Sequence, residues 1–455
     1  MRNAQNTPLT QDILKGDLWK LLWRFSLPAI IGMSINGINA FFDGLFVGQF
    51  VGQSAVAAIS LAFPLTFITA GFSAMIGVGG SSILSQAIGS GNTEVQQNVL
   101  STATSLSIIV SVVLMILGIY FAPEMIGFLG GTGEILDQGV LYYRITLVGA
   151  FFRIHAVAVN MLIRAEGKVK EAMSMSIVTA LCNIVLNYIF MGILDLGIAG
   201  AAWATVASMF IFTIIGYGYY LMGNANYEVN PLSLSLQSKF AIPILKIGVS
   251  AMMMQIMFFV QQSIVFLVIK KYGGDWDIAL MGTTYRVLLL MIFPSFGFAI
   301  AFQPIAGINY GAQIIERIIR GFRLFSFTST IALIIPWTLV MLFPAIVLGW
   351  MLPEADFSDQ DIFHVRMMLC TLPIFPSFFI GTTLFQATGE AKMAAFMTIF
   401  RDLALFVPFA IILPIYYGVG GIYYTSIPIN IITIGLIVFF ISRQFKIWRM
   451  RFSVT

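Results

Sequence analysis

The sequence predicts an all-α polytopic membrane protein, with twelve transmembrane helices in two six-helix lobes related by an internal parallel repeat. The first observation is composition, since 59% of the 455 residues are hydrophobic and only 10% are charged, against about 45–50% and about 25% in soluble domains. The second is the length of the apolar runs, which are continuous rather than alternating and so indicate helices rather than a β-barrel. The third is similarity of the chain to itself at a fixed offset of 222 residues.

The apolar runs, divided at polar or Gly/Pro-rich gaps, give twelve predicted spans. They cover residues 19–47, 54–85, 98–122, 139–162, 170–191, 197–222, 240–269, 277–305, 322–349, 362–386, 393–416 and 418–442. The first twenty residues lack an apolar segment ending in a cleavage site, so we expect no secretory signal. A polar tail precedes the first span.

Charge in the connections predicts the orientation. Seventeen of the 24 basic residues fall in the two tails or in the even-numbered connections, whereas the odd-numbered connections are mostly acidic or neutral. The positive-inside rule then places both termini in the cytoplasm. The net charge of +4 comes from basic residues scattered singly among apolar segments, so we expect the lipid bilayer and no nucleic acid as a partner.

The repeat pairs equivalent positions in the two halves. Gly89 aligns with Gly311, and the segment from Leu162 aligns with the segment from Leu384 at the same offset. Six spans in each half return the second half to the orientation of the first, and substrate sites of such parallel repeats usually lie between the halves. We therefore expect an N-terminal lobe over residues 1–222, a cytoplasmic linker over 223–238 and a C-terminal lobe over 239–455.

Enzyme and metal chemistry have little support. Cys182 and Cys370 lie inside apolar runs, which indicates core packing rather than a disulfide or zinc site. No HExxH, Walker or GxSxG motif is present, and Ser73 with His155 is a weak serine–histidine possibility. We therefore expect a protein that is not an enzyme and has no metal site and no cofactor.

Asp43 is the first candidate for function, because a carboxylate inside the bilayer is expensive and by default a functional hypothesis. Its depth places it in the outer half of the first span, so an interfacial aspartate in external water is the alternative. Asn183, Asn187 and Thr205 fall in the same outer half, and Asn39 shares the helix face of Asp43. These side chains could form one polar pocket.

Pro28 lies in the same predicted helix as Asp43. A proline inside a helix removes a hydrogen bond and produces a kink, which membrane helices tolerate. The kink could be a hinge coupled to titration of Asp43, or a static bend.

Four other charged residues lie well inside spans, namely Arg153, Arg286, Arg401 and Asp402. We expect structural ion pairs between helices for them, and neighbours in sequence such as Arg401 and Asp402 point about 100° apart and are poorly placed to pair with each other. His155 could relay protons, but a hydrogen-bonded core histidine is the commoner case.

A substrate cavity could be lined by the seventh span. That span carries Met257 among several methionines, with Gln255 and Gln261, and methionine suits a surface that accepts varied apolar ligands. Plain packing is the alternative for such a face. Arg153 is a further candidate for the cavity.

Three segments resemble a known family: NAFFDGLFVGQFVGQSAVAAIS from Asn39, NIVLNYIF from Asn183 and LGIAGAAWATVAS from Leu196. They are similar to the multidrug and toxic compound extrusion (MATE) transporters, in particular the DinF/MepA-like bacterial branch. The resemblance covers essentially the whole chain. It implies drug export by antiport against protons or sodium across the bacterial cytoplasmic (inner) membrane.

The resemblance also implies residue roles. The cation site of that branch corresponds to Asp43, Tyr142, Asn183, Asn187 and Thr205, and Pro28 matches the proline whose helix is proposed to bend. Asn187 departs from the family, where relatives commonly carry a second carboxylate. With one titratable group left, the proton is the simpler coupling ion, with sodium as the alternative.

The sequence therefore predicts a monomeric, cation-coupled antiporter, with the proton as coupling ion, that exports amphipathic, often cationic small molecules. A flippase or exporter of lipid-linked glycans or other anionic lipids is the alternative. It would hold phosphates with Arg144, Arg153 and Arg286, which should then line the cleft between the lobes. An intramembrane hydrolase is the third possibility.

Overall fold

The computed structural model describes residues 5, 7–129, 131–350 and 356–452, and all regular elements in these ranges are helical. After a short helix α1 (Pro8–Lys15), six spanning units make up the first half. They are α2 (Leu18–Phe50), α3 (Gln53–Ser90), α4 (Thr93–Phe128), the bent pair α5 (Gly133–Val148) and α6 (Ala150–Ala165), α7 (Val169–Asn187) with its π-helical continuation η2 (Tyr188–Ile193), and α8 (Gly197–Leu221).

Six further units make up the second half; the breaks in the fourth and fifth units of the first half recur, and the third and sixth units are interrupted as well. They are α9 (Ser238–Tyr272), α10 (Asp275–Gly311), α11 (Ile315–Leu342) followed by the short α12 (Pro344–Gly349), α13 (Asp359–Leu369) with η3 (Leu372–Ile374) and α14 (Pro376–Ala387), α15 (Ala391–Ile399) with the π-helix η4 (Phe400–Phe406) and α16 (Val407–Tyr417), and α17 (Gly420–Tyr424) with α18 (Ser426–Phe452).

The helices confirm the predicted spans. Nine of the described helices are long and apolar enough to cross a membrane, and eleven when each bent pair counts as one span. The twelfth is α2, whose 33 residues measure about 50 Å at about 1.5 Å per residue. Most helices run further than predicted, as α18 does by reaching Phe452, because the apolar pattern stops at the membrane surface while backbone hydrogen bonding continues beyond it.

Polar residues begin several of these helices. Asp17 at the start of α2 accepts a hydrogen bond from the backbone N–H of Trp19, and Asn92 at the start of α4 accepts one from Val95. At α13, Ser358 and Asp361 cap each other's backbone. Such side chains satisfy helix N–H groups that have no partner within the helix.

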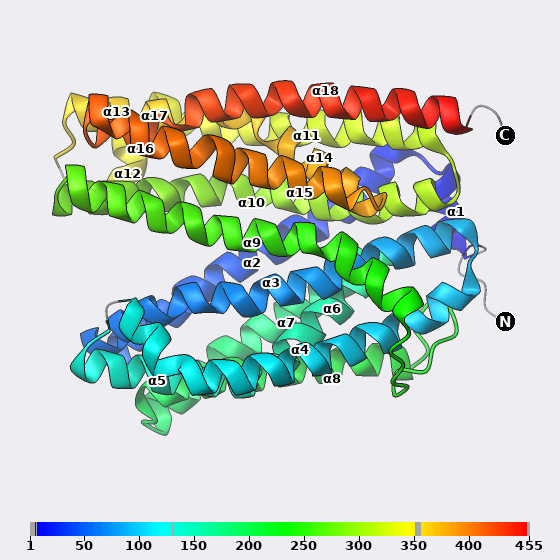
Figure 1. Ribbon diagram of the computed structural model, residues 1–455, viewed down its shortest axis with the longest axis horizontal. Coiled ribbons are helices and arrows are strands. Elements are labelled where there is room, and N and C mark those ends of the chain that lie inside the picture. Colours follow the sequence, from blue (N-terminus) through cyan, green and yellow to red (C-terminus); the bar gives the residue numbers. More distant parts are fainter. Residues whose placement is uncertain (1–4, 6, 130, 351–355, 453–455) are drawn as a thin grey trace.

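The two halves lie side by side and are closest at one end of the bundle, where both described ends of the chain also lie (Figure 1). Equivalent glycines meet where α3 and α10 touch. A Cβ atom on Gly89 would lie 1.9 Å from the carbonyl oxygen of Ile308, and one on Gly311 would lie 2.0 Å from that of Gln86. Because Gln86 and Ile308 are also 222 residues apart, the contact is reciprocal, as a two-fold relation between parallel halves requires.

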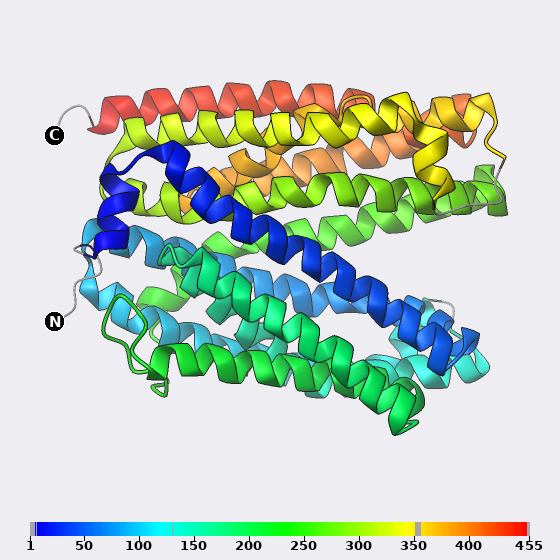
Figure 2. The same cartoon turned by 180° about the vertical axis from the view of Figure 1, so that it is seen from behind.

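Helix α2 belongs to the first half by sequence and yet contacts both halves. It packs against α7 on one side and against α10 on the other, and it runs obliquely between the two halves (Figure 2). Pro28 lies inside this helix, which remains continuous. Helix α1 is held to the second half, since the guanidinium of Arg317 donates to the backbone oxygens of Ile13 at 2.7 Å and Gly16 at 2.5 Å.

Candidate functional site

A cavity of about 550 Å³ opens within the first half of the chain, a size typical of small-molecule sites. Helices α2, α3, α5, α6, α7 and α8 all contribute to its wall. Its lining is Met33, Asn39, Asp43, Val47, Ile59, Ser60, Phe63, Thr66, Tyr142, Arg153, Val157, Asn160, Arg164, Met173, Ser176, Thr179, Ala180, Asn183, Asn187, Ala201, Thr205, Ser208, Met209 and Phe212. The cavity thus collects the five side chains that the family resemblance assigns to a cation site, together with Asn39.

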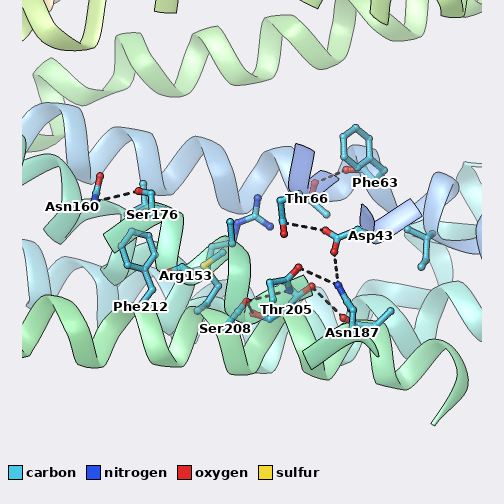
Figure 3. A pocket seen from close by; sticks show the side chains of 18 of the residues that line it. Asp43, Phe63, Thr66, Arg153, Asn160, Ser176, Asn187, Thr205, Ser208 and Phe212 are labelled. Atoms are coloured by element: carbon cyan, nitrogen blue, oxygen red, sulfur yellow. Dashed lines mark hydrogen bonds between the residues drawn. The ribbon is translucent and has the colours of Figure 1, made fainter. Parts of the chain in front are cut away.

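Asp43 is held by amides from two helices. The Nδ2 atom of Asn187 on α7 donates to Oδ1 of Asp43 across 2.5 Å, and Nδ2 of Asn39, one turn earlier on α2, lies 3.5 Å from Oδ2. Figure 3 shows Asp43 and Asn187 pointing toward each other across the cavity. The Oδ1 atom of Asn39 is buried and has no partner among the described residues, so it is available to a bound water or ligand.

The hydrogen bonds continue from Asn187 to the eighth helix. Asn187 also donates to Oδ1 of Asn183 across 3.1 Å, and Asn183 donates to the hydroxyl of Ser208 across 3.3 Å. Thr205 lines the cavity one turn before Ser208 and donates to the backbone oxygen of Ala201. Ser208 was missed by the sequence analysis, although its position three residues after Thr205 on a helix places it on the same face.

Basic and polar side chains line the cavity along one face of α6. Arg153, Asn160 and Arg164 all contribute to the wall, and spacings of seven and eleven residues return to the same helix face. Tyr142 on α5 is close enough to interact electrostatically with both Asp43 and Arg153. Asn160 and Arg164 were also missed, and their spacing from Arg153 is the signal that could have found them.

The remaining cavity candidates lie elsewhere. Met257, Gln255 and Gln261 belong to α9, which contributes no residue to the lining. They therefore do not line this cavity, which lies within one half of the chain, and their place in a substrate cavity between the halves stays a prediction. The reason is local packing: Gln255 lies near Gly71 of α3, and Gln261 donates to Asp402 across 2.7 Å.

Arg401 and Asp402 pair with each other, contrary to the expectation from helical geometry. Both lie in the π-helix η4, whose wider turn changes the angle between neighbouring side chains, and the long arginine side chain folds back onto the carboxylate. The Arg401 guanidinium also lies over the rings of Phe375 at 4.5 Å and Phe378 at 5.1 Å. The expected partner on another helix exists for Asp402 in Gln261.

His155 is buried between the rings of Phe151 and Tyr217, at centroid distances of 5.3 and 4.9 Å. Neither ring nitrogen has a hydrogen-bond partner among the described residues, so the expected hydrogen-bonded histidine is instead an aromatic packing element. The hydroxyl of Ser73 donates to the backbone oxygen of Thr69 at 2.7 Å. In the described part of the chain, Ser73 and His155 therefore form no hydrogen bond of the kind a serine hydrolase uses.

The three arginines of the flippase hypothesis do not converge. Arg153 lines the cavity, whereas Arg144 and Arg286 are exposed. Arg144 donates to the backbone oxygen of Ile119. Of the three arginines that the flippase hypothesis requires, only Arg153 lines this cavity.

The MatE family model matches residues 28–189 and again residues 250–412, one match in each half. The chain is 25% identical to the probable multidrug resistance protein YoeA of Bacillus subtilis over 91% of each chain. It is 23% identical to the multidrug export protein MepA of Staphylococcus aureus over 90% of each chain.

A crystal structure of a MATE protein in the bent conformation superposes with a TM-score of 0.91 at 25% identity, covering 98% of this chain and 99% of that one. The sequence relatives and this structure agree on the same family over nearly the full length. With a repeated family match that spans more than half of the residues, the chain belongs to the MATE family of transporters.

Proposed function

We propose that this transporter is a proton-coupled antiporter that exports amphipathic small molecules, and that Asp43 is its proton-binding residue. The observation that carries the proposal is the cavity around Asp43, whose described lining contains no other carboxylate. Loading and release of one proton at Asp43 would change the charge of the cavity by one unit. That change would make binding of a cationic substrate and binding of the proton mutually exclusive in the cavity.

The hydrogen bonds at Asp43 support a proton rather than sodium. A sodium ion needs several oxygen ligands, whereas Asn187 directs an N–H group at the carboxylate, in the place where relatives commonly carry a second carboxylate. An N–H donor competes with a cation for the carboxylate oxygen. Protonation of Asp43 requires only that the amide hydrogen bond weaken or rearrange.

Helix α2 supports coupling between the site and the rest of the molecule. It carries both Asp43 and Pro28, 15 residues apart in sequence, and it packs against α7 of its own half and α10 of the other. We propose Pro28 as the hinge at which α2 changes shape when the hydrogen bond from Asn187 to Asp43 breaks. The bend would move a helix that both halves contact.

The apolar part of the cavity supports amphipathic substrates. Met33, Phe63, Met209 and Phe212 contribute to the wall, and sulfur and aromatic side chains accept apolar ligands of varied shape. The named relatives are multidrug proteins. We propose that the protein acts as a monomer in the bacterial cytoplasmic membrane with both termini in the cytoplasm, and that residues 223–238 are the cytoplasmic linker between lobes 1–222 and 239–455.

Dye efflux from proteoliposomes tests this function. Efflux should follow an imposed pH gradient and be indifferent to an imposed sodium gradient. Asp43→Asn should abolish it while the purified protein stays folded, and Asp137→Asn, outside the cavity, is the control. Full efflux by Asp43→Asn, or efflux driven by sodium alone, would disprove proton coupling through Asp43.

A further inference from the structure

The charge of the cavity is unusual for a transporter of plain cations. Its described lining carries one acidic side chain, Asp43, and two guanidinium groups, Arg153 and Arg164. The other titratable group in the wall is Tyr142. The cavity therefore has an excess of one positive charge when Asp43 is ionised and of two when Asp43 is protonated.

In the described part of the chain, neither arginine forms an ion pair with an acidic side chain. Among the described residues, the guanidinium of Arg153 has neither a hydrogen bond nor an ion pair, and Nε of Arg164 donates to the backbone oxygen of Asn160, at 3.5 Å. The acid next in sequence, Glu166, accepts instead from the hydroxyl of Tyr219 and the backbone N–H of Asn226. Charges kept away from bulk water without a partner are costly, so their retention here points to a ligand.

The positions of the charges define two ends of one cavity. Arg153, Asn160 and Arg164 follow one face of α6 over about 16 Å, whereas Asp43 and Asn187 lie at the opposite end. Figure 3 shows Arg153 between Asn160 and the Asp43 end. Tyr142 interacts electrostatically with both Asp43 and Arg153, so these two opposite charges lie near the same phenol.

The coupling proposed above selects among charged ligands. A ligand with an acidic group alone would bind more tightly when Asp43 takes up a proton, because the excess positive charge rises, and that is the wrong sign for antiport. A ligand with a cationic group alone would compete with the proton but would be repelled by Arg153. A ligand with both groups can place its cation near Asp43 and its acid at Arg153, and protonation of Asp43 then displaces it.

We infer that Arg153, supported by Arg164, forms an anion-binding subsite, and that the preferred substrates are amphipathic zwitterions carrying an acidic group as well as a cationic centre. This inference rests on the proposed function. The acid can be a carboxylate or a sulfonate, since a guanidinium binds either through paired N–H groups. A cavity of about 550 Å³ accommodates a drug-sized molecule of this kind.

Three xanthene dyes of similar size test the subsite. Rhodamine B is a zwitterion with a free carboxylate, its methyl ester keeps only the cation, and fluorescein keeps the acid without a cationic centre. Binding to the purified protein, measured by fluorescence polarisation without a gradient, should favour rhodamine B over both. Sulforhodamine B, with sulfonates in place of the carboxylate, shows whether the subsite distinguishes the two acids.

Variants of Arg153 then test whether this residue causes the preference for rhodamine B. Arg153→Gln should weaken rhodamine B binding by about tenfold or more, the effect of losing a charged hydrogen-bond donor, and leave the ester unchanged. Arg153→Lys, which keeps the charge but not the planar fork, should lose less, and Arg144→Gln on the exposed face should behave as wild type. Equal binding of rhodamine B and its ester by the wild type, or an equal loss of both in Arg153→Gln, would overturn the subsite.

Failure of the proposed function has a different signature. If Asp43→Asn still exports dye along a pH gradient, proton coupling through Asp43 fails, while the gradient-free comparison of rhodamine B with its ester still decides the anion subsite. If the wild type binds rhodamine B no better than its ester while efflux still depends on Asp43, the anion subsite is overturned and the proposed function stands.

Discussion

Ser81 and Gln303 are 222 residues apart, the period of the repeat, and Nε2 of Gln303 donates to the hydroxyl of Ser81 across 2.6 Å. Equivalent residues can touch only beside the axis that relates the two halves. The reciprocal contacts of Gly89 and Gly311, eight residues further along α3 and α10, lie on the same line. The axis therefore runs between α3 and α10 along the bundle, as expected for a parallel repeat in a membrane.

Because the backbones of α3 and α10 approach closely at this axis, one added methyl group should strongly lower the stability of the fold. Gly89→Ala would place its Cβ 1.9 Å from a backbone oxygen of α10, and backbone atoms cannot turn aside. We expect a loss of stability of about 1–3 kcal/mol or more, as for overpacked cores, measured as a lower midpoint of thermal unfolding in detergent. Gly218→Ala, where a Cβ meets no atom within 4 Å, should be neutral. Equal stability of the two variants would argue against the close packing of α3 on α10.

Much of this architecture was predictable from the sequence, because the bilayer imposes a length and an apolar composition on each span. The repeat was predictable as well, since Gly89 and Gly311 mark it directly. Convergence of Asp43 with Asn187 followed from their similar depth and from the family resemblance. The pairing of Arg401 with Asp402 was not predictable, because the π-helix at 400–406 changes the angle between neighbouring side chains from that of an α-helix.

The sequence predicted a polar pocket around Asp43, but not that the cavity would exclude α9. Its position within one half depends on how large side chains fill the space between α3 and α9, and Met252 against Gly71 is an example. A self-similarity pattern shows where the halves meet but not whether the space there is filled. The three missed residues Asn160, Arg164 and Ser208 were accessible in principle through helix spacing from Arg153 and Thr205.

Asn187 provides a test of the proposal that the coupling ion is a proton rather than sodium. Asn187→Asp would replace the N–H donor at 2.5 Å from Asp43 with a second carboxylate, giving oxygen ligands of the kind a hard cation requires. We expect the variant to acquire dye efflux driven by a sodium gradient in proteoliposomes. Asn160→Asp, which adds a carboxylate to the same cavity on the α6 face, should not acquire it. Efflux that stays independent of sodium in Asn187→Asp would contradict the role given to the amide.

Glu166 predicts a dependence of stability on pH. This carboxyl group follows α6, is fully buried, and accepts from the hydroxyl of Tyr219 at 3.2 Å and the backbone N–H of Asn226 at 3.0 Å. Burial raises the pKa of Glu166 from 4.5 to about 7, against the lowering effect of those hydrogen bonds and of Lys168. The folded protein therefore holds this proton more tightly than the unfolded chain.

The sign of the effect follows from that difference. The stabilisation is complete below the unfolded value of 4.5 and is lost as the pH rises through about 7. Its upper limit is about 3 kcal/mol at about 1.36 kcal/mol per pKa unit. Glu166→Gln should make the midpoint of thermal unfolding less dependent on pH across this interval. At the alkaline end, the midpoint of the variant should lie above that of the wild type. Exposed Glu171→Gln is the control, and an unchanged slope in Glu166→Gln would refute the assignment.

The Arg401–Asp402 pair predicts a large effect that a second substitution reverses. Asp402 is 6% exposed and accepts from both Arg401 and Gln261. Arg401→Met would leave a buried carboxylate with one amide partner, and breaking a buried ion pair costs about 3–5 kcal/mol. Replacing both members by Arg401→Met with Asp402→Asn removes the uncompensated charge and should recover most of the loss, because the methionine still packs against Phe375 and Phe378. Thermal unfolding of the single and double variants measures the coupling, and additive losses would show that the two side chains act independently.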